Sequence, residues 1–258
     1  MGVYYEIAEG NYYFPNEFPT GEGQLQVNYY AIKGSKKNIL IDTSAPFTTE
    51  DTIESVSKII DLENLDYIFL THMDLDHAGG VREILKVAPK ARVVSSPTAF
   101  GKGTSLFGIP ATKFAIVFPG EEIDLGDRKV RVEPSLIEDG HTYWLFDNKT
   151  GTYFSSDAFG SIHLGPVNYF AENVPSEAFA AGFSIWQHMN FNMLSRIDVN
   201  LFRQGLQAMK RLDIQRIASV HGPIIPQQEL GQVLELMAAQ PTAEMPPMPP
   251  LPDFLRLP

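Results

Sequence analysis

Histidine and aspartate side chains are concentrated in one short segment of the chain. Four side chains that can bind a metal ion fall within six residues, at His72, Asp74, Asp76 and His77. In an extended segment alternate side chains point the same way, so we expect His72, Asp74 and Asp76 to face one side and His77 to turn inward as a helix begins. Two converging carboxylates repel each other unless a cation neutralises them. The segment therefore predicts a metal site.

The same segment could also be the ordinary start of a helix. Acidic residues are common in the first turn of a helix, where they face its positive end. A helix cap, however, needs one carboxylate that accepts backbone N–H bonds, and it needs no imidazole. The run holds two carboxylates and two imidazoles, which favours the metal site.

The composition limits the kind of metal site and the kinds of partner. The chain has no cysteine, so disulfides, thiolate zinc and iron–sulfur clusters are excluded. With 20 basic and 31 acidic residues the formal net charge is −11, which argues against binding of nucleic-acid phosphates. No apolar run approaches the roughly 20 residues that span a bilayer, and the first residues lack the basic region of a signal peptide. We expect a cytoplasmic protein without a nucleic-acid or membrane partner.

The metal run follows a wholly apolar strand, residues 67–70, within an alternation of predicted strands and helices. The predicted strands cover residues 12–14, 25–32, 38–42, 67–70, 91–94 and 216–220, with antiparallel strands between about 114 and 159; the predicted helices begin near residue 49 and cover about 80–87, 176–211 and 227–239. Two halves, each β-rich and then helical, favour an α/β fold with two sheets packed face to face and helices outside, a four-layer αββα sandwich. We expect one domain over residues 1–240 and an extended proline-rich tail over 241–258.

The pattern His-x-[His/Glu/Asp]-x-Asp-His-x-Gly-Gly after a buried strand resembles the metallo-β-lactamase superfamily. The resemblance begins with Leu-Ile-Asp-Thr at residues 40–43 and extends to about residue 239. It includes Ser-Ser-Asp-Ala-Phe-Gly at residues 155–160 and Ser-Val-His-Gly at residues 219–222. By resemblance, Asp157 is the carboxylate that bridges two metals, and His221 is the last histidine ligand.

Within that superfamily the chain is most similar to the flavodiiron branch. Zinc hydrolases carry a histidine at the position of Asp74, whereas flavodiiron proteins carry a glutamate there. A carboxylate makes the site harder and more anionic, which suits iron better than zinc. The segments around Asp157 and His221 also resemble that branch. Because no flavodoxin-like domain follows, we expect a stand-alone di-iron core without an FMN site in this chain.

The ligand in the middle of the chain has two candidates. Counting back from Asp157 with the flavodiiron spacing leads to Glu138, whereas Gly140-His141-Thr142 resembles the Gly-His-Thr of the hydrolases. We expect one of the two residues to bind metal and favour Glu138. Of the remaining histidines, His163 is expected to have a supporting or surface role, and His188 to pack within a helical region.

The resemblance implies the following ligand sets and function. One metal is held by His72, Asp74 and Glu138 or His141, the second by Asp76, His77 and His221, with Asp157 bridging. We expect a non-haem di-iron protein that is a homodimer. With an external electron donor it would be an oxidoreductase that binds and reduces O2 or NO, and without a donor it would be an oxygen-binding or sensing protein. The alternative is a dizinc hydrolase, in which a metal-bound hydroxide attacks an ester, lactone or thioester.

Overall fold

The structure is a computed structural model that describes residues 3–20, 23–137, 140–245 and 247. It divides into two compact units. The first comprises Met1–Asn16, Val27–Ser135 and Asp139–Thr150, and the second comprises Glu17–Gln26, Leu136–Glu138 and Gly151–Pro258. Within the described ranges no helix is long and apolar enough to cross a membrane.

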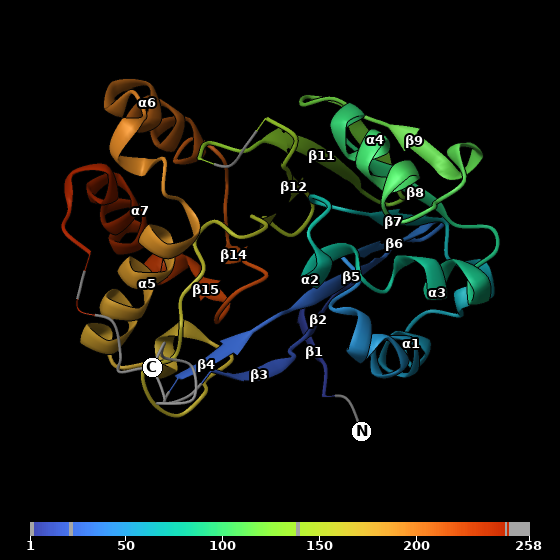
Figure 1. Cartoon of the computed structure of the whole chain (residues 1–258), viewed down its shortest axis with the longest axis horizontal. Helices are drawn as coiled ribbons and strands as arrows, with labels where there is room; N and C mark the ends of the chain where they lie inside the picture. Colours follow the sequence, from blue (N-terminus) through green and yellow to red (C-terminus); the bar gives the residue numbers. More distant parts are fainter. Residues whose placement is uncertain (1–2, 21–22, 138–139, 246, 248–258) are drawn as a thin grey trace, which may run out of the picture. The chain divides into compact units, whose positions relative to one another are not determined.

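The first unit contains a mixed seven-stranded sheet with the order β1-β2-β5-β6-β7-β8-β9. The strands are β1 (Tyr5–Ala8), β2 (Asn11–Phe14), β5 (Tyr29–Lys33), β6 (Asn38–Ile41), β7 (Tyr67–Phe69), β8 (Arg92–Ser95) and β9 (Phe114–Ile116). Pairing is antiparallel from β1 to β6 and parallel from β6 to β9. Parallel neighbours need crossover connections, and these include the helices α1 (Thr49–Ser57), α3 (Val81–Val87) and α4 (Pro97–Ser105), which flank the sheet (Figure 1).

The apolar core of this sheet places the metal run at one edge. Leu40 on β6, Ile68 on β7 and Val93 on β8 are buried in one cluster together with residues of α1 and α3. Because β6, β7 and β8 run in parallel, their carboxyl ends meet at the same edge, which is where open α/β sheets place their ligands. The segments that follow these strands therefore lie at this edge, and one of them is the metal run.

Three further strands of the first unit form an antiparallel meander, namely β10 (Glu122–Asp124), β11 (Lys129–Pro134) and β12 (Tyr143–Asp147). A buried ion pair joins Arg128 Nη1 to Asp147 Oδ2 at 3.1 Å. Asn11 of β2 donates to the same carboxylate oxygen at 3.1 Å. Because every partner is hydrogen-bonded, this buried charge pair fixes the end of β12 without leaving an unmatched charge.

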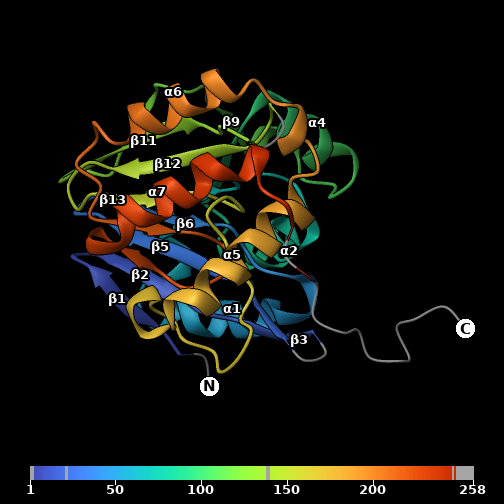
Figure 2. The same cartoon turned by 90° about the vertical axis from the view of Figure 1, so that its left-hand side faces the viewer.

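The second unit contains the hairpin β3 (Glu17–Thr20) and β4 (Gly23–Gln26), together with β13 (Thr152–Phe154), β14 (Arg216–Ala218) and β15 (Ile225–Pro226). Its three long helices are α5 (Ser176–Asn190), α6 (Val199–Met209) and α7 (Leu230–Ala239) (Figure 2). Strands β13 and β14 are parallel, so the segments that follow them lie side by side. Val220 N donates to Ser156 O at 2.8 Å, which joins the two loops that carry Asp157 and His221.

Three predicted elements differ from the structure. The strand expected over 25–32 is interrupted at Val27, whose N–H donates to Asn16 O at 2.9 Å; β4 then pairs with β3, and β5 with β2 and β6. The helical region expected over 176–211 is divided, because Asp198 caps a new helix by accepting bonds from Asn200 N and Leu201 N. The helix expected over 80–87 follows a separate short helix, α2 (Leu75–Ala78). Most of the predicted tail, residues 246 and 248–258, lies outside the described residues.

Candidate metal centre

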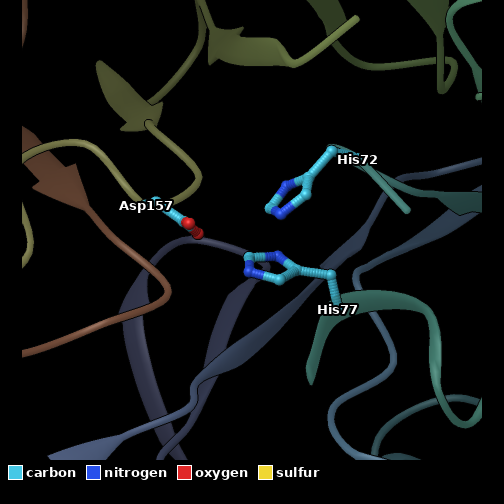
Figure 3. A group of neighbouring side chains, drawn as sticks. All are labelled: His72, His77 and Asp157. Atoms are coloured by element: carbon cyan, nitrogen blue, oxygen red, sulfur yellow. The ribbon is translucent and has the colours of Figure 1, made fainter. Parts of the chain in front are cut away.

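The first unit brings His72, Asp74, Asp76 and His77 together around the turn between β7 and α2. The rings of His72 and His77 lie side by side, with their centroids 3.9 Å apart (Figure 3). His72 Nε2 lies 3.7 Å from Asp74 Oδ2, and His77 Nε2 lies 3.7 Å from Asp76 Oδ2. Each imidazole of the run thus has a carboxylate beside its Nε2 atom.

His77 is oriented by the buried carboxylate of Asp42, the residue after β6. His77 Nδ1 donates to Asp42 Oδ2 at 2.9 Å, and both side chains are fully buried. Thr71 fixes the same carboxylate, with its N–H donating to Oδ1 and its hydroxyl to Oδ2, each at 2.8 Å. Because Nδ1 carries the proton in this bond, Nε2 is the atom left to bind an ion, as in carboxylate–histidine–metal sites.

The backbone of the metal run departs from the predicted extended form. Asp74 is extended, with φ −76° and ψ 156°, but Asp76 lies in the first turn of α2. The expectation that His72, Asp74 and Asp76 alternate along one extended segment is therefore wrong beyond Asp74. Asp74 occupies the N-cap position, yet within the described part of the chain its side chain accepts no capping hydrogen bond from α2. The carboxylate is 68% exposed, so it does not serve as the ordinary cap.

The second unit brings Asp157 and His221 together at the ends of β13 and β14. Their Oδ1 and Nε2 atoms lie 3.3 Å apart, and Figure 3 shows the Asp157 side chain extending from its loop. His221 Nδ1 donates to the backbone oxygen of Gln26 at 2.8 Å. As at His77, Nδ1 is held by an oxygen acceptor and Nε2 faces a carboxylate. Trp186 lies against the His221 ring, with the ring centroids 4.3 Å apart.

The remaining histidines have supporting positions. His163 is buried, and its Nε2 donates to Gln26 Oε1 at 2.9 Å; Gln26 thus contacts both His163 and His221. Burial lowers the pKa of His163 from its ordinary value of 6.5. His188 lies near the end of α5, where Nδ1 is 2.9 Å from Ser184 O.

Of the two candidates for the ligand in the middle of the chain, Glu138 lies outside the described residues. His141 is described, and its Nε2 lies 2.6 Å from Nζ of Lys102 on α4. A lysine ammonium can only donate, so Nε2 accepts this bond. Ser96 also holds His141, donating from its hydroxyl to His141 O at 2.8 Å. The choice between Glu138 and His141 stays a prediction.

The donor set in each unit fits a metal ion of the hard or intermediate class. Ligand atoms about 2.1 Å from one ion, at angles of about 90–110°, lie about 3.0–3.4 Å apart. The carboxylate–imidazole separations of 3.3 Å in the second unit and 3.7 Å in the first are at or slightly above this range. Oxygen and imidazole nitrogen are ligands that iron and zinc both accept.

Four residues that shape the candidate site were absent from the predicted ligand set, namely Gln26, Asp42, Lys102 and Asn190. Asn190 Nδ2 donates to Asp157 Oδ2 at 2.8 Å. Asp42 has a sequence signal, since a single acidic residue directly follows an apolar strand. Gln26 acts on His221 through its backbone oxygen, which any residue could supply, so its identity carries no signal. Lys102 and Asn190 lie far along the chain from their partners, and their roles emerge only from the fold.

The chain resembles known proteins in both sequence and structure. A family model described as ODP family beta lactamase matches residues 25–222. An uncharacterized protein of Methanocaldococcus jannaschii is 28% identical over 81% of this chain and 51% of its own length. Flavo-diiron protein FprA2 of Clostridium acetobutylicum is 25% identical over 79% of this chain and 50% of its own. The anaerobic nitric oxide reductase flavorubredoxin of Salmonella typhi is 29% identical over 61% of this chain and 33% of its own length. The chain thus spans a third to about half of the length of these relatives.

Solved structures show the same fold at lower sequence identity. Rubredoxin oxygen:oxidoreductase from Desulfovibrio gigas superposes with a TM-score of 0.80 at 17% identity, covering 92% of this chain and 61% of that chain. A fragment of putative diflavin flavoprotein A 5 from Nostoc superposes with a TM-score of 0.78 at 18% identity, covering 92% of this chain and 94% of that fragment. The second match shows that a fragment of similar length has this fold.

Proposed function

Because the chain belongs to the ODP family of beta lactamases and shares the α/β fold of flavodiiron structures, we propose that it is a di-iron protein that reduces O2 or NO. The relatives named for such chemistry are a flavo-diiron protein, a nitric oxide reductase and an oxygen oxidoreductase. The chain covers only part of each. Its own activity, substrate and partners are therefore part of the proposal.

The proposed ligands are those predicted from the sequence. His72 and Asp74 with Glu138 or His141 would hold one ion, Asp76, His77 and His221 would hold the other, and Asp157 would bridge them. Each unit contributes imidazole and carboxylate donors, so the proposal requires ligands from both.

The observation that carries the proposal is the orientation of His77 by Asp42. A neutral imidazole whose Nδ1–H is held by a buried carboxylate is a better metal ligand, because the carboxylate raises the basicity of Nε2. The three aspartates of the proposed set, Asp74, Asp76 and Asp157, make the site rich in hard oxygen donors, which favours iron over zinc.

Bound as two ferrous ions, the iron would supply two electrons, enough to convert O2 and two protons to hydrogen peroxide or two NO and two protons to N2O and water. The chain's own residues hold the ligand atoms and leave a path from solvent. An open groove of about 590 Å³ is lined by Asp74 and Asp76 together with Leu75, Leu106 and Phe107. Leu75 and Leu106 are 64% and 74% exposed. This apolar rim would admit a small uncharged ligand and accept an external electron donor.

An anaerobic single-turnover experiment tests the proposal. The protein is loaded with two equivalents of ferrous iron, excess iron is removed, and limiting O2 or NO is added while O2 uptake, peroxide and N2O are measured. We expect about one O2, or two NO, consumed per two irons, with further turnover only when a reductant is supplied. The His77→Asn variant and protein-free ferrous iron are the controls. Iron-loaded protein that consumes neither gas faster than these controls would overturn the proposal.

We also propose that the chain forms a homodimer in the cytoplasm, as the resemblance to flavodiiron proteins suggests. Sedimentation equilibrium decides the point: a mass of about twice 28.8 kDa is expected, and a monomer at all concentrations contradicts it.

A further inference from the structure

The last turn of α5 holds the loop that carries Asp157. Trp186 Nε1 donates to Asp157 O at 2.8 Å, and Gln187 Nε2 donates to Gly160 O at 2.9 Å. Asn190 Nδ2 donates to Asp157 Oδ2 at 2.8 Å. Residues 186 and 187 lie four and three positions before residue 190, so both are neighbours of Asn190 on the helix surface. Two of these bonds fix the backbone of the loop, and the third reaches the carboxylate itself.

The loop needs such support because its backbone is unusual. Ser156 and Phe159 have φ values of +55° and +63°, in the left-handed region that L side chains rarely adopt. Gly160 allows the close approach of Trp186, since a Cβ there would lie 2.5 Å from Trp186 Nε1. Asp157 is thus held between two left-handed residues, in a geometry that the surrounding contacts must maintain.

The two oxygens of Asp157 have different surroundings. Oδ2 accepts the amide hydrogen of Asn190, whereas Oδ1 lies 3.3 Å from Nε2 of His221. His221 is itself fixed by Gln26 O on one side and by the Trp186 ring. Asp157 Oδ1 and His221 Nε2 are therefore the two candidate ligand atoms that lie together in the second unit.

We propose that Asn190 is a positioning residue: by holding Oδ2, it leaves Oδ1 as the atom through which the Asp157 carboxylate would bridge the two ions. This inference rests on the proposed function, because it assigns the binding mode of a proposed ligand. The amide is suited to the task, since it donates a hydrogen bond without neutralising the carboxylate. A lysine or arginine at this position would compensate the negative charge and compete with the ion. Asn190 is exposed, so replacing it should not disturb the packing of α5.

The test uses Asn190→Leu, which removes the donor, and Asn190→Gln, which retains an amide. Asn192→Leu is the matched control, an exposed asparagine two residues further along the chain. Mn²⁺ affinity is measured through the fluorescence of Trp186, in a Trp144→Phe background that leaves Trp186 as the only tryptophan, because the chain has two. We expect Asn190→Leu to weaken Mn²⁺ binding about 10-fold to 100-fold, with partial recovery in Asn190→Gln and no change in Asn192→Leu.

A spectroscopic readout separates positioning from a merely structural role. Infrared difference spectra of protein labelled with ¹³C at the aspartate carboxyl report the splitting between the asymmetric and symmetric carboxylate stretches upon Mn²⁺ addition. Asn190→Leu should narrow this splitting for Asp157, because both oxygens become available to the ion. The Asp157→Asn variant identifies the band. Asn190→Ala repeats both measurements if the leucine variant melts at a lower temperature than the parent.

The outcomes distinguish the inference from the function on which it rests. A parent protein that binds Mn²⁺ tightly, with Asn190 variants unchanged in both affinity and splitting, overturns the role of Asn190 and leaves the metal centre standing. A parent protein that binds neither Mn²⁺ nor Fe²⁺ overturns both. Weakened binding with a narrowed splitting in Asn190→Leu, absent from Asn192→Leu, supports the inference.

Discussion

Asp42 Oδ2 accepts a 2.9 Å hydrogen bond from Nδ1 of His77, and neither side chain is exposed to solvent. The two residues are 35 positions apart in the chain. They meet because β6 and β7 are parallel neighbours and end at the same edge of the sheet. Asp42 has φ +59°, a conformation that costs energy for a residue with a side chain and that recurs at functional sites. The residue in this conformation is thus the one whose carboxylate orients the His77 imidazole.

Asp42→Asn tests this relationship. The amide keeps the size of the carboxylate and tolerates the left-handed backbone, but it removes the negative charge that raises the basicity of His77. We expect metal affinity to fall about 10-fold to 100-fold, measured by competition with a metal indicator. Asp66→Asn is the control, because Asp66 accepts a 2.8 Å bond from Asn38 N in the same unit without contacting His77. Equal affinities in the two variants would show that Asp42 does not support the metal.

The contiguous part of the site could be predicted from the sequence, because local spacing carries its information. His72, Asp74, Asp76 and His77 follow a buried strand, and the structure places them together. Asp157 and His221 were predicted from motif resemblance, and they too lie side by side. The α/β fold class was predicted correctly, since the alternation of apolar strands and helices indicates sheets covered by helices.

The supporting contacts could not be predicted, for physical reasons that differ from residue to residue. Gln26 holds His221 through a backbone oxygen, which leaves no mark on residue type. Asn190 and Lys102 reach their partners through tertiary packing across 33 and 39 positions. Alternating side chains predict an extended backbone from His72 to Asp76. In the structure Asp74 is instead the N-cap of helix α2, which includes Asp76. The interruption of the predicted strand at Val27, whose N–H donates to Asn16 O, likewise depends on a contact between segments that are separated in the sequence.

Replacing Asp74 by histidine should shift the metal preference. The Asp74→His variant replaces an exposed carboxylate with a softer imidazole and restores the ligand pattern of the zinc hydrolases. We expect weaker retention of iron and a larger share of zinc, measured as the Fe:Zn ratio after purification from medium containing both metals. Asp61→His, an exposed helix cap away from the metal run, is the control. An unchanged Fe:Zn ratio would mean that Asp74 does not set the preference.

Metal counts decide between Glu138 and His141. His141 Nε2 accepts a bond from Lys102, so we expect Glu138→Ala to lose metal from one site and His141→Ala to retain both. Lys102→Met removes the ammonium group that occupies His141 Nε2. If Glu138 is the ligand, this variant should hold the same number of metal ions as the parent protein. Loss of one metal in the histidine variant alone would reverse the assignment and bring the chain closer to the hydrolases.

His163 should contribute a measurable pH dependence to folding. Burial lowers its pKa below 6.5, so the unfolded chain binds this proton more readily than the folded chain does. At a pH above the pKa that His163 has in the unfolded chain, its contribution to the free energy of unfolding is fully present. The contribution is lost as the pH falls through the lower pKa that His163 has in the folded chain. Denaturation of metal-free protein between about pH 7 and pH 5 should therefore show a steeper loss of stability in the parent than in His163→Gln. Parallel pH profiles for the two proteins would refute this contribution.

The metal content of protein purified without added metal tests the account most directly, combined with the visible spectrum before and after exposure to air. We expect about two irons per chain and a colourless ferrous form that becomes coloured in air as the iron is oxidised. Asp157→Asn should hold less iron and show a weaker colour change. Colourless protein that holds two tightly bound zinc ions and hydrolyses lactones or thioesters would contradict the account and establish the hydrolase alternative.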